Sequence, residues 1–239
     1  MQLELAEKFA GIRVVGDVHG EARQFRAAIE GARAADLFVL QLGDLTDRGP
    51  DDAGALRLML DLLDQGAGAF LLGNHDRRLL RALMGHQVKR GHGLEETLAA
   101  LDAAPDLIPR AAEAISAAPA WLRRPGALFV HGALHPEMLL EDSPPLAYAA
   151  RTPALAFALY GETSGRKLAN GMPERLYGWV DRIPRGITVF CGHDVLAHDG
   201  RPQLRAGAAG GRAVFVDTGA GKQGHLSWID LTRNGERAA

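Results

Sequence analysis

Cysteine, net charge and long apolar runs are all scarce in this chain. Cys191 is the only cysteine, so no disulfide can form within the chain, which fits a reducing compartment. The formal net charge of −2 gives no general attraction to nucleic acid or to an anionic membrane surface. No apolar run approaches the roughly 18 residues of a membrane span, and the N-terminal stretch lacks the segments of a signal peptide. These absences predict a cytoplasmic protein with no membrane partner and no generic nucleic-acid groove.

Glycine and apolar residues, by contrast, are plentiful. With 239 residues, 47% hydrophobic residues and 29 glycines, the composition is typical of a globular protein with many tight loops. A chain of this length should bury roughly 70–75% of its unfolded surface, which is enough for a sizeable core. The sequence has no internal repeat, heptad pattern or low-complexity tract. We therefore expect one large α/β domain or two small ones.

The first third of the chain repeats one pattern three times: an apolar strand, a polar loop and an amphipathic helix. The strands are expected at 12–15, 37–42 and 69–72, and the helices around 25–32, at 51–66 and at 77–84. Such repeats imply parallel strands joined by right-handed crossovers. The three loops should therefore emerge at the same edge of a sheet, where ligands bind in open α/β folds.

The rest of the chain predicts a second sheet. Further strands are expected at 127–130, 188–191, 213–216 and 226–231, and helices at 94–101 and 107–115. Little helical pattern separates the later strands, which favours hairpin-like pairing and a second, mixed sheet. Residues 136–185 are rich in proline and combine short helical pieces with irregular ones. We interpret this segment as a substrate-access cover over the site rather than as core.

Side chains suited to metal and phosphate binding follow the predicted strands. The set consists of Asp17, His19, Asp44, Asp47, Arg48, Asn74, His75, His131, His193 and Asp217, of which the last could equally be an ordinary strand-end aspartate. Imidazole, carboxylate and amide ligands without a thiolate suit manganese, iron, zinc, nickel or cobalt rather than calcium or an iron-sulfur cluster.

The ligand set is too large for one ion. Two ions that share a carboxylate can hold a bridging hydroxide and clamp a phosphate for in-line displacement. An arginine beside them offers the planar fork that phosphate oxygens prefer. The residue types therefore predict phosphoester hydrolysis.

Several motifs carry a resemblance to a known family. They are Asp17-Val18-His19-Gly20, Gly43-Asp44-Leu45-Thr46-Asp47-Arg48-Gly49, Gly73-Asn74-His75-Asp76, His131 and Gly192-His193. Their types and spacing resemble the calcineurin-like metallophosphoesterases, and the Asp-Arg-Gly ending resembles the PPP-type phosphatase branch. Residues 91–97 and 158–165 look most like the bacterial PrpE-type diadenosine tetraphosphatases and the phosphatase module of bacterial polynucleotide kinase-phosphatases. The chain lacks a Gly-x-x-x-x-Gly-Lys-Ser/Thr loop, so no kinase module accompanies it.

The resemblance covers nearly the whole chain, so it implies a single domain over 1–239. The implied fold is a four-layer α/β/β/α sandwich of two mixed β-sheets flanked by helices, with the site at the C-terminal strand ends. Two positions depart from the family pattern. The chain has Gly132-Ala133 where relatives have Ala-Gly. His193 is followed by Asp194-Val195 where the broad family often has Gly-His-x-His, which removes one possible ligand but agrees with the PPP branch.

The resemblance also implies a role for each residue. The ligands of two divalent metal ions would be Asp17 and His19 for the first, Asn74, His131 and His193 for the second, and Asp44 as the bridge. His75 would act as general acid and Asp47 would orient it. Arg48, together with Asn74 and His75, would bind the substrate, and Arg48 would stabilise charge on the phosphoryl oxygens.

On this basis we expect a PPP-type phosphatase that acts on phosphomonoesters of proteins or nucleotides. Manganese is the expected ion, with iron, zinc, nickel or cobalt as alternatives, and the substrate would be a nucleotide, a phosphoprotein or an RNA end. The competing hypotheses are a symmetrical dinucleoside tetraphosphatase, a 2′,3′-cyclic phosphodiesterase and a non-catalytic scaffold on the same fold. The other histidines are interpreted as surface or structural groups. For Arg151, Arg175 and Arg182 in the proline-rich segment, contact with substrate is one interpretation, and a solvated surface position is the one we favour.

Overall fold

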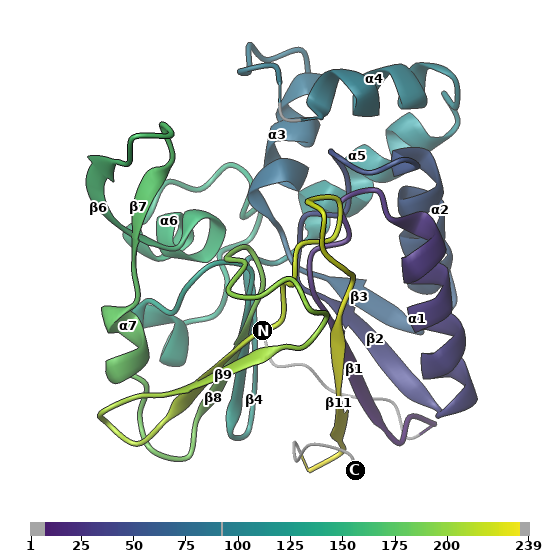
Figure 1. Ribbon diagram of the computed structural model, residues 1–239. Coiled ribbons are helices and arrows are strands. Elements are labelled where there is room, and N and C mark those ends of the chain that lie inside the picture. Colours follow the sequence, from purple (N-terminus) through teal and green to yellow (C-terminus); the bar gives the residue numbers. More distant parts are fainter. Residues whose placement is uncertain (1–7, 92, 235–239) are drawn as a thin grey trace.

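The computed structural model describes residues 8–91 and 93–234 and contains two β-sheets packed face to face (Figure 1). The first sheet has the strand order β11-β1-β2-β3. Its members are β1 (Gly11–Val15), β2 (Leu37–Gln41), β3 (Gly68–Phe70) and β11 (Trp228–Thr232). β1, β2 and β3 run parallel, and β11 pairs with β1 in the antiparallel sense. The three predicted loops therefore leave the sheet at the same edge, as expected.

The second sheet is also mixed, as predicted, with the strand order β4-β5-β8-β10-β9. Its members are β4 (Trp121–Arg124), β5 (Ala127–Val130), β8 (Thr188–Cys191), β9 (Gln203–Ala206) and β10 (Arg212–Phe215). The three central strands run parallel, and the two edge strands β4 and β9 are antiparallel to their neighbours. The sequence did not predict these edge strands, because β9 is mostly exposed and so lacks an apolar pattern.

Alternate side chains of the central strands fill two separate cores. Those that face the other sheet include Ile12, Leu40, Phe129, Phe190 and Val214. Those that face the helices include Val15, Val39, Leu128, Val189 and Phe215. Because both faces of each sheet are covered, the central strands read as continuous apolar runs, which is why the sequence revealed them.

Helices cover the outer faces of both sheets, which confirms the predicted layers (Figure 1). Over the first sheet lie α1 (Ala22–Ala34), α2 (Asp52–Asp64), α3 (Asn74–Leu83), α4 (Leu94–Asp102) and α5 (Leu107–Ala117). Beside the second sheet lie the 3-10 helix η1 (Pro136–Leu139), α6 (Pro153–Tyr160) and α7 (Gly178–Asp181). Within the described ranges, no helix combines the length and the apolarity needed to cross a membrane.

Part of the proline-rich segment 136–185 is core, contrary to the sequence interpretation. Leu155 and Leu159 of α6 are buried, and so is Trp179 of α7, whose ring centroid lies 5.7 Å from that of Phe215 in β10. The exposed part is the hairpin of β6 (Glu162–Lys167) and β7 (Pro173–Leu176), which forms a separate two-stranded sheet. A role for this hairpin over the site remains a prediction.

The sequence predicted that helix α3 begins at Arg77. In the structure it begins three residues earlier, at Asn74. The Asp76 carboxylate accepts a hydrogen bond of 2.9 Å from the Gly73 backbone N–H, which satisfies one donor at the start of the helix. Asn74 and His75 therefore belong to the first helical turn, and the helix fixes the direction of both side chains.

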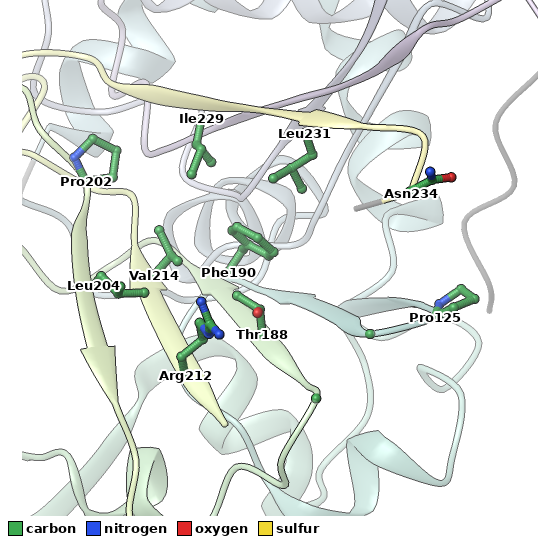
Figure 2. A pocket seen from close by; sticks show the side chains of 12 residues that line it. Pro125, Thr188, Phe190, Pro202, Leu204, Arg212, Val214, Ile229, Leu231 and Asn234 are labelled. Atoms are coloured by element: carbon green, nitrogen blue, oxygen red, sulfur yellow. The ribbon is translucent and has the colours of Figure 1, made fainter. Parts of the chain in front are cut away.

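A cavity of about 490 Å³ opens at the edge of the sheets where β5, β8 and β10 begin. Figure 2 shows Ile229 and Leu231 of β11 facing Phe190 and Val214 of the second sheet across this space. Its lining contains no histidine and no carboxylate. The cavity is therefore a gap between the sheets, remote from the predicted ligands at the opposite edge.

Phe129→Ala should destabilise the protein strongly, because the Phe129 side chain is fully buried between the sheets. Its ring stacks on that of Phe190 with a centroid distance of 5.3 Å. We expect the free energy of unfolding to fall by about 3–5 kcal/mol, as measured by urea denaturation. Leu140→Ala is the control, since Leu140 is 79% exposed and its truncation should change stability by less than about 0.5 kcal/mol.

Candidate metal centre

The segments that follow five strands bring the predicted ligands together at one edge of both sheets. Asp17 and His19 follow β1, Asp44 follows β2, Asn74 and His75 begin α3, His131 follows β5, and His193 follows β8. Asp44 belongs to two groups of three potential metal ligands, in each of which the donor atoms lie within 4.8 Å of one another. One group adds His19 and His75, and the other adds His131 and His193. Asp44 is therefore the centre of the arrangement.

The backbone is left-handed at several of these positions. The φ angles of His19, Asp44 and His193 are 44°, 60° and 64°, and Asp47 and Arg48 follow with 73° and 79°. Such non-glycine conformations cost of order 1–3 kcal/mol each and persist only where the surroundings enforce them. Each of these turns follows a strand, and it directs the side chain into the space between the loops.

Glycines allow the loops to approach one another closely. A Cβ atom on Gly73 would lie 2.3 Å from the Asp44 backbone nitrogen, and one on Gly192 would lie 2.4 Å from Asp17 Oδ1. These distances are too short for any side chain. The glycines next to Asn74 and His193 are therefore required by the contact between loops of different strands.

Two of the histidines present an unprotonated nitrogen to the site. His19 Nδ1 lies 2.9 Å from the Thr46 carbonyl oxygen, and His131 Nδ1 lies 2.9 Å from the Leu42 carbonyl oxygen. A carbonyl only accepts, so each Nδ1 carries the hydrogen, and burial lowers the pKa of His19, which keeps that ring neutral. Nε2 of neutral His19 then offers a lone pair, the state that binds a metal ion, and the bond of His131 Nδ1 to Leu42 leaves its Nε2 facing the site in the same way.

Several acceptor atoms in the site face one another without a hydrogen between them. His19 Nε2 and Asp17 Oδ2 are buried, lie 3.6 Å apart and have no hydrogen-bond partner among the described residues. Asp44 Oδ2 lies 3.4 Å from His131 Nε2, and the Asn74 amide, whose NH2 group can donate to the same nitrogen at 3.2 Å, borders this space. Lone pairs at these distances repel unless a cation lies between them. The donor set therefore fits divalent cations on both sides of Asp44.

The charges of the site lead to the same conclusion. Burial acts to raise the pKa of Asp44, and attraction to positive charge on the rings of His131, His75, His19 and His193 outweighs burial and holds the pKa of this carboxyl well below its usual range. Where those rings are neutral, a bound cation supplies the positive charge instead. The pKa of Asp17 is raised, first by burial and then by repulsion from Asp217. A buried carboxylate that repels its neighbours is stabilised when a cation binds.

The loop that carries Asp44 is held by a further carboxylate. Asp76 accepts hydrogen bonds from the backbone N–H groups of Asp44 at 2.7 Å and Leu45 at 3.0 Å, besides that of Gly73. Asp44 Oδ1 in turn accepts from the His75 backbone N–H at 2.8 Å. These contacts tie the loop after β2 to the first turn of α3.

Arg175 reaches the site, although the sequence suggested a solvated surface residue. Its Nη2 donates to His193 Nε2 at 2.6 Å, its Nε lies 3.1 Å from Asp194 Oδ1, and it also bonds the Tyr160 carbonyl oxygen. Since arginine only donates, the ring proton of neutral His193 is on Nδ1, which lies 3.1 Å from His131 Nε2. Metal binding through His193 Nδ1 would therefore move this proton to Nε2 and break the contact with Arg175.

His75 and Asp47 form a buried pair. His75 Nδ1 bonds Asp47 Oδ2, and Arg78 donates to the same oxygen. Burial acts to raise the pKa of Asp47, but the hydrogen bonds from His75, Thr97 and Arg78 lower it, so Asp47 is an ionised acceptor. His75 Nε2 lies 3.9 Å from Asp44 Oδ2 and so faces the ligand cluster. The geometry matches a histidine held in one orientation by a carboxylate.

Thr97, in α4, connects Asp47 to a second buried carboxyl, a link that the sequence did not reveal. Its Oγ1 lies 2.6 Å from both Asp47 Oδ1 and Asp52 Oδ2. One hydroxyl proton cannot serve two carboxylates. Burial raises the pKa of Asp52 to about 6, so below that pH Asp52 is the carboxyl that carries a proton: it donates to Thr97, and Thr97 donates to Asp47.

The remaining predicted residues lie at the margin of the cluster. Asp217 is buried, but its carboxylate bonds the Gly219 N–H and the Lys222 ammonium and belongs to neither ligand group. Lys222, which the sequence reasoning missed, also lies 3.6 Å from Asp17 Oδ2. The one sequence feature that could have pointed to Lys222 is its position in the glycine-rich loop after β10. The guanidinium of exposed Arg48 makes no hydrogen bond or ion pair within the described chain.

The other histidines do not enter the site. His86, His198 and His225 are exposed, and His135 packs edge-on against Phe157 at a centroid distance of 5.1 Å. His92 lies outside the described residues.

Two mixed sheets with paired His/Asp clusters at the carboxyl ends of their strands define a metal-dependent hydrolase of phosphate compounds. The family model described as calcineurin-like phosphoesterase matches residues 11–197. The chain belongs to the calcineurin-like phosphoesterase family, and it is a phosphoesterase by that membership.

Known relatives agree with this family. The chain is 29% identical over 232 residues to the bis(5′-nucleosyl)-tetraphosphatase PrpE [asymmetrical] of Geobacillus thermodenitrificans, covering 87% of this chain and 85% of the relative. The enzyme of the same name from Halalkalibacterium halodurans is also 29% identical, covering 86% of this chain and 84% of the relative.

Solved structures share the fold. The crystal structure of a putative diadenosine tetraphosphatase gives a TM-score of 0.60 at 22% identity, covering 98% of this chain and 94% of that one. A protein serine/threonine phosphatase from Saccharomyces cerevisiae, with similarity to human phosphatase PP5, gives 0.62 at 16% identity, covering 98% of this chain and 78% of that one.

Asp44→Ala should lose both metal ions, because Asp44 is the shared member of both ligand groups. Asp47→Asn should keep both, because Asp47 belongs to neither ligand group and bonds His75 through Nδ1, the nitrogen that faces away from Asp44. The measurement is metal content by elemental analysis after equilibration with Mn²⁺ and gel filtration, with circular dichroism to verify folding. An Asp47→Asn variant that bound no metal would contradict this assignment.

The raised pKa of Asp52 predicts a measurable pH dependence of stability. Because the folded pKa of about 6 lies above the usual value of 3.8, the contribution of Asp52 is fully present below pH 4 and is lost as the pH rises through 6. Between pH 4.5 and 7, the wild type should lose about 1–2 kcal/mol more unfolding free energy than Asp52→Asn, which has no proton to lose. Urea denaturation at several pH values tests this, and parallel curves for the two proteins would refute it.

Proposed function

We propose that this chain hydrolyses phosphate esters and anhydrides of nucleotides with two divalent metal ions. Asp17 and His19 would hold one ion, Asn74, His131 and His193 the other, and Asp44 would bridge them. The observation that carries the proposal is that Asp44 is shared by two ligand groups, and that His75, which is counted in one of them, has its other ring nitrogen bonded to Asp47. Such ions supply a nucleophile at neutral pH by lowering the pKa of water, and they neutralise phosphate charge.

His75 serves as the general acid in this proposal. Its Nδ1 is bonded to Asp47, so Nε2 is the nitrogen that can give a proton to a leaving oxygen. The ionised Asp47 stabilises the imidazolium before that transfer, while Thr97 and Arg78 hold Asp47 in place. The leaving group then departs as a neutral hydroxyl or a less charged phosphate.

The phosphoryl group itself would be bound by Arg48 and by the start of α3. Arg48 is exposed, and no partner within the described chain occupies its guanidinium, so its fork is available for phosphate oxygens. The N-terminus of the ten-residue helix α3 lies at Asn74, and its dipole favours an anion there. Both features suit a substrate phosphate between the two ligand groups.

Dinucleoside tetraphosphates are our first substrate candidates. The relatives named as asymmetrical bis(5′-nucleosyl)-tetraphosphatases align over most of this chain, which supports a phosphate chain as the target. The Asp47-Arg48-Gly49 motif, which resembles PPP-type phosphatases, favours phosphomonoesters as the second candidate. A scaffold without activity is disfavoured, because all predicted ligands and His75 are retained.

Manganese is the ion we favour, since oxygen and imidazole ligands without thiolate suit it, with iron, zinc, nickel or cobalt as alternatives.

We place the enzyme in the cytoplasm, because Cys191 is buried in β8 and has no other cysteine to pair with. We also propose a single domain over 1–239 in which the β6–β7 hairpin limits access to the site. The ion pair of Arg175 in β7 with Asp194, the residue after His193, supports this last point.

His75→Asn should lower kcat by about 10²–10⁴-fold, because the proton donor to the leaving group is lost. The assay is hydrolysis of p-nitrophenyl phosphate, with Mn²⁺ added back after chelation. His198→Asn, at an exposed histidine away from the cluster, is the matched control and should retain wild-type rates. If no divalent metal supports turnover of p-nitrophenyl phosphate or of a dinucleoside tetraphosphate by the folded wild type, the scaffold hypothesis would prevail.

A further inference from the structure

A second pocket opens directly beside the ligand cluster, along one face of α3. It has a volume of about 290 Å³, and Asn74 forms one end of its lining. The other side chains that matter here are Arg77, Arg78, Arg81, Lys89 and Tyr160. We name it the α3 pocket. A molecule bound at the metal centre could extend into it without crossing the fold.

Helix geometry explains why the cations of the α3 pocket form a row. Asn74, Arg78 and Arg81 are spaced i, i+4 and i+7, so they lie on one face of α3. At 1.5 Å per residue, Arg81 lies about 10 Å along the helix axis from Asn74. The row is longer than a single phosphate group. It offers positive charge at increasing distance from the metal centre.

Of the four cationic side chains that line the α3 pocket, two are fixed in place and two are available. Arg77 Nε donates to the Tyr148 carbonyl oxygen at 2.6 Å, and Arg78 bonds Asp47. Arg81 and Lys89 are exposed and make no hydrogen bond or ion pair with the described residues. No acidic side chain lines the pocket, although the whole chain carries a net charge of −2. The pocket is therefore a local anion site and not part of a generally basic surface.

Tyr160 adds an aromatic surface to the pocket. It is the last residue of α6 and is 44% exposed, and its carbonyl oxygen is held by Arg175. An exposed ring on a fixed backbone beside arginines is suited to stacking with a nucleobase, which is tolerant of base identity. The pocket thus combines phosphate-binding cations with a surface for a base.

We propose that the α3 pocket binds the part of the substrate beyond the scissile bond when that part is a phosphate chain ending in a nucleoside. Arg81 and Lys89 hold the phosphates, and Tyr160 stacks on the base. This inference rests on the proposed function and deepens it. The pocket makes the enzyme select nucleotides with a phosphate chain over simple phosphomonoesters, which contact only the metal centre and Arg48.

The test compares two substrates in the Mn²⁺-loaded full chain. Arg81→Gln/Lys89→Gln should lower kcat/KM for diadenosine tetraphosphate by about 10- to 100-fold, mainly through KM, because two charge-assisted contacts are lost. The same variant should hydrolyse p-nitrophenyl phosphate within twofold of the wild type. Arg26→Gln/Arg185→Gln removes the same charge at two exposed arginines outside the pocket and should leave both rates unchanged. Equal losses on both substrates, or no loss on either, would overturn the proposal.

The contribution of Tyr160 is tested separately. Tyr160→Ala should raise KM for diadenosine tetraphosphate by about 5- to 100-fold, since base stacking on an aromatic ring is lost. Tyr160→Phe keeps the ring and should behave as the wild type. A Tyr160→Phe variant as impaired as Tyr160→Ala would refute stacking.

A binding measurement separates failure of the pocket from failure of the proposed function. Calorimetric titration of diadenosine tetraphosphate into the His75→Asn protein needs no turnover. If the wild type hydrolyses neither substrate, the proposed function fails. The proposed role of the pocket is still tested, by the affinity of the His75→Asn protein for diadenosine tetraphosphate. Adding Arg81→Gln/Lys89→Gln to the His75→Asn protein should lower its affinity for diadenosine tetraphosphate by about 10-fold or more. Equal affinities, or no measurable binding to His75→Asn, would overturn the pocket.

Discussion

The burial of Asp44 among imidazoles is the constraint on which the rest of the site depends. A carboxylate removed from water must be compensated by positive charge, and here it is surrounded by four histidines on four different segments. Its second oxygen accepts no backbone hydrogen bond and faces three ring nitrogens at 3.4–3.9 Å. This leaves a set of electron pairs that a pair of cations would satisfy. The loops of both sheets are arranged around that requirement.

The architecture supplies this arrangement by placing polar loops at the end of a well-packed apolar framework. The strands bury side chains on both faces, and the turns after them take up left-handed conformations at His19, Asp44 and His193. The free-energy cost of these left-handed conformations is small compared with the free energy gained by burying the apolar side chains of the strands that enforce them. Gly73 and Gly192 let loops of different strands touch. Stability of the core and precision of the site are therefore linked.

Helix α3 connects three aspects of the chemistry within a short stretch. Its first turn supplies Asn74 and His75 to the cluster, while Asp76 holds the loop that carries Asp44. Its next turns supply Arg78, which bonds the partner of His75, and Arg81 in the adjacent pocket. One rigid element thus relates the proposed proton donor, a metal ligand and the proposed binding site for the rest of the substrate. Fixed distances between these groups follow from helix geometry.

The sequence by itself determined the central strands, their layers and the candidate ligand residues, because apolar runs and residues at strand ends are local features. It did not determine where α3 begins, the edge strands, or the burial of α6 and α7. The contacts of Thr97, Arg175 and Lys222 were also hidden, since each pairs with a residue far away in the chain. Only tertiary structure decides such pairings, because side chains that are distant in sequence become neighbours when strands and helices pack. The local sequence thus shows which residue types follow the strands, whereas the fold sets the orientation and protonation of their side chains.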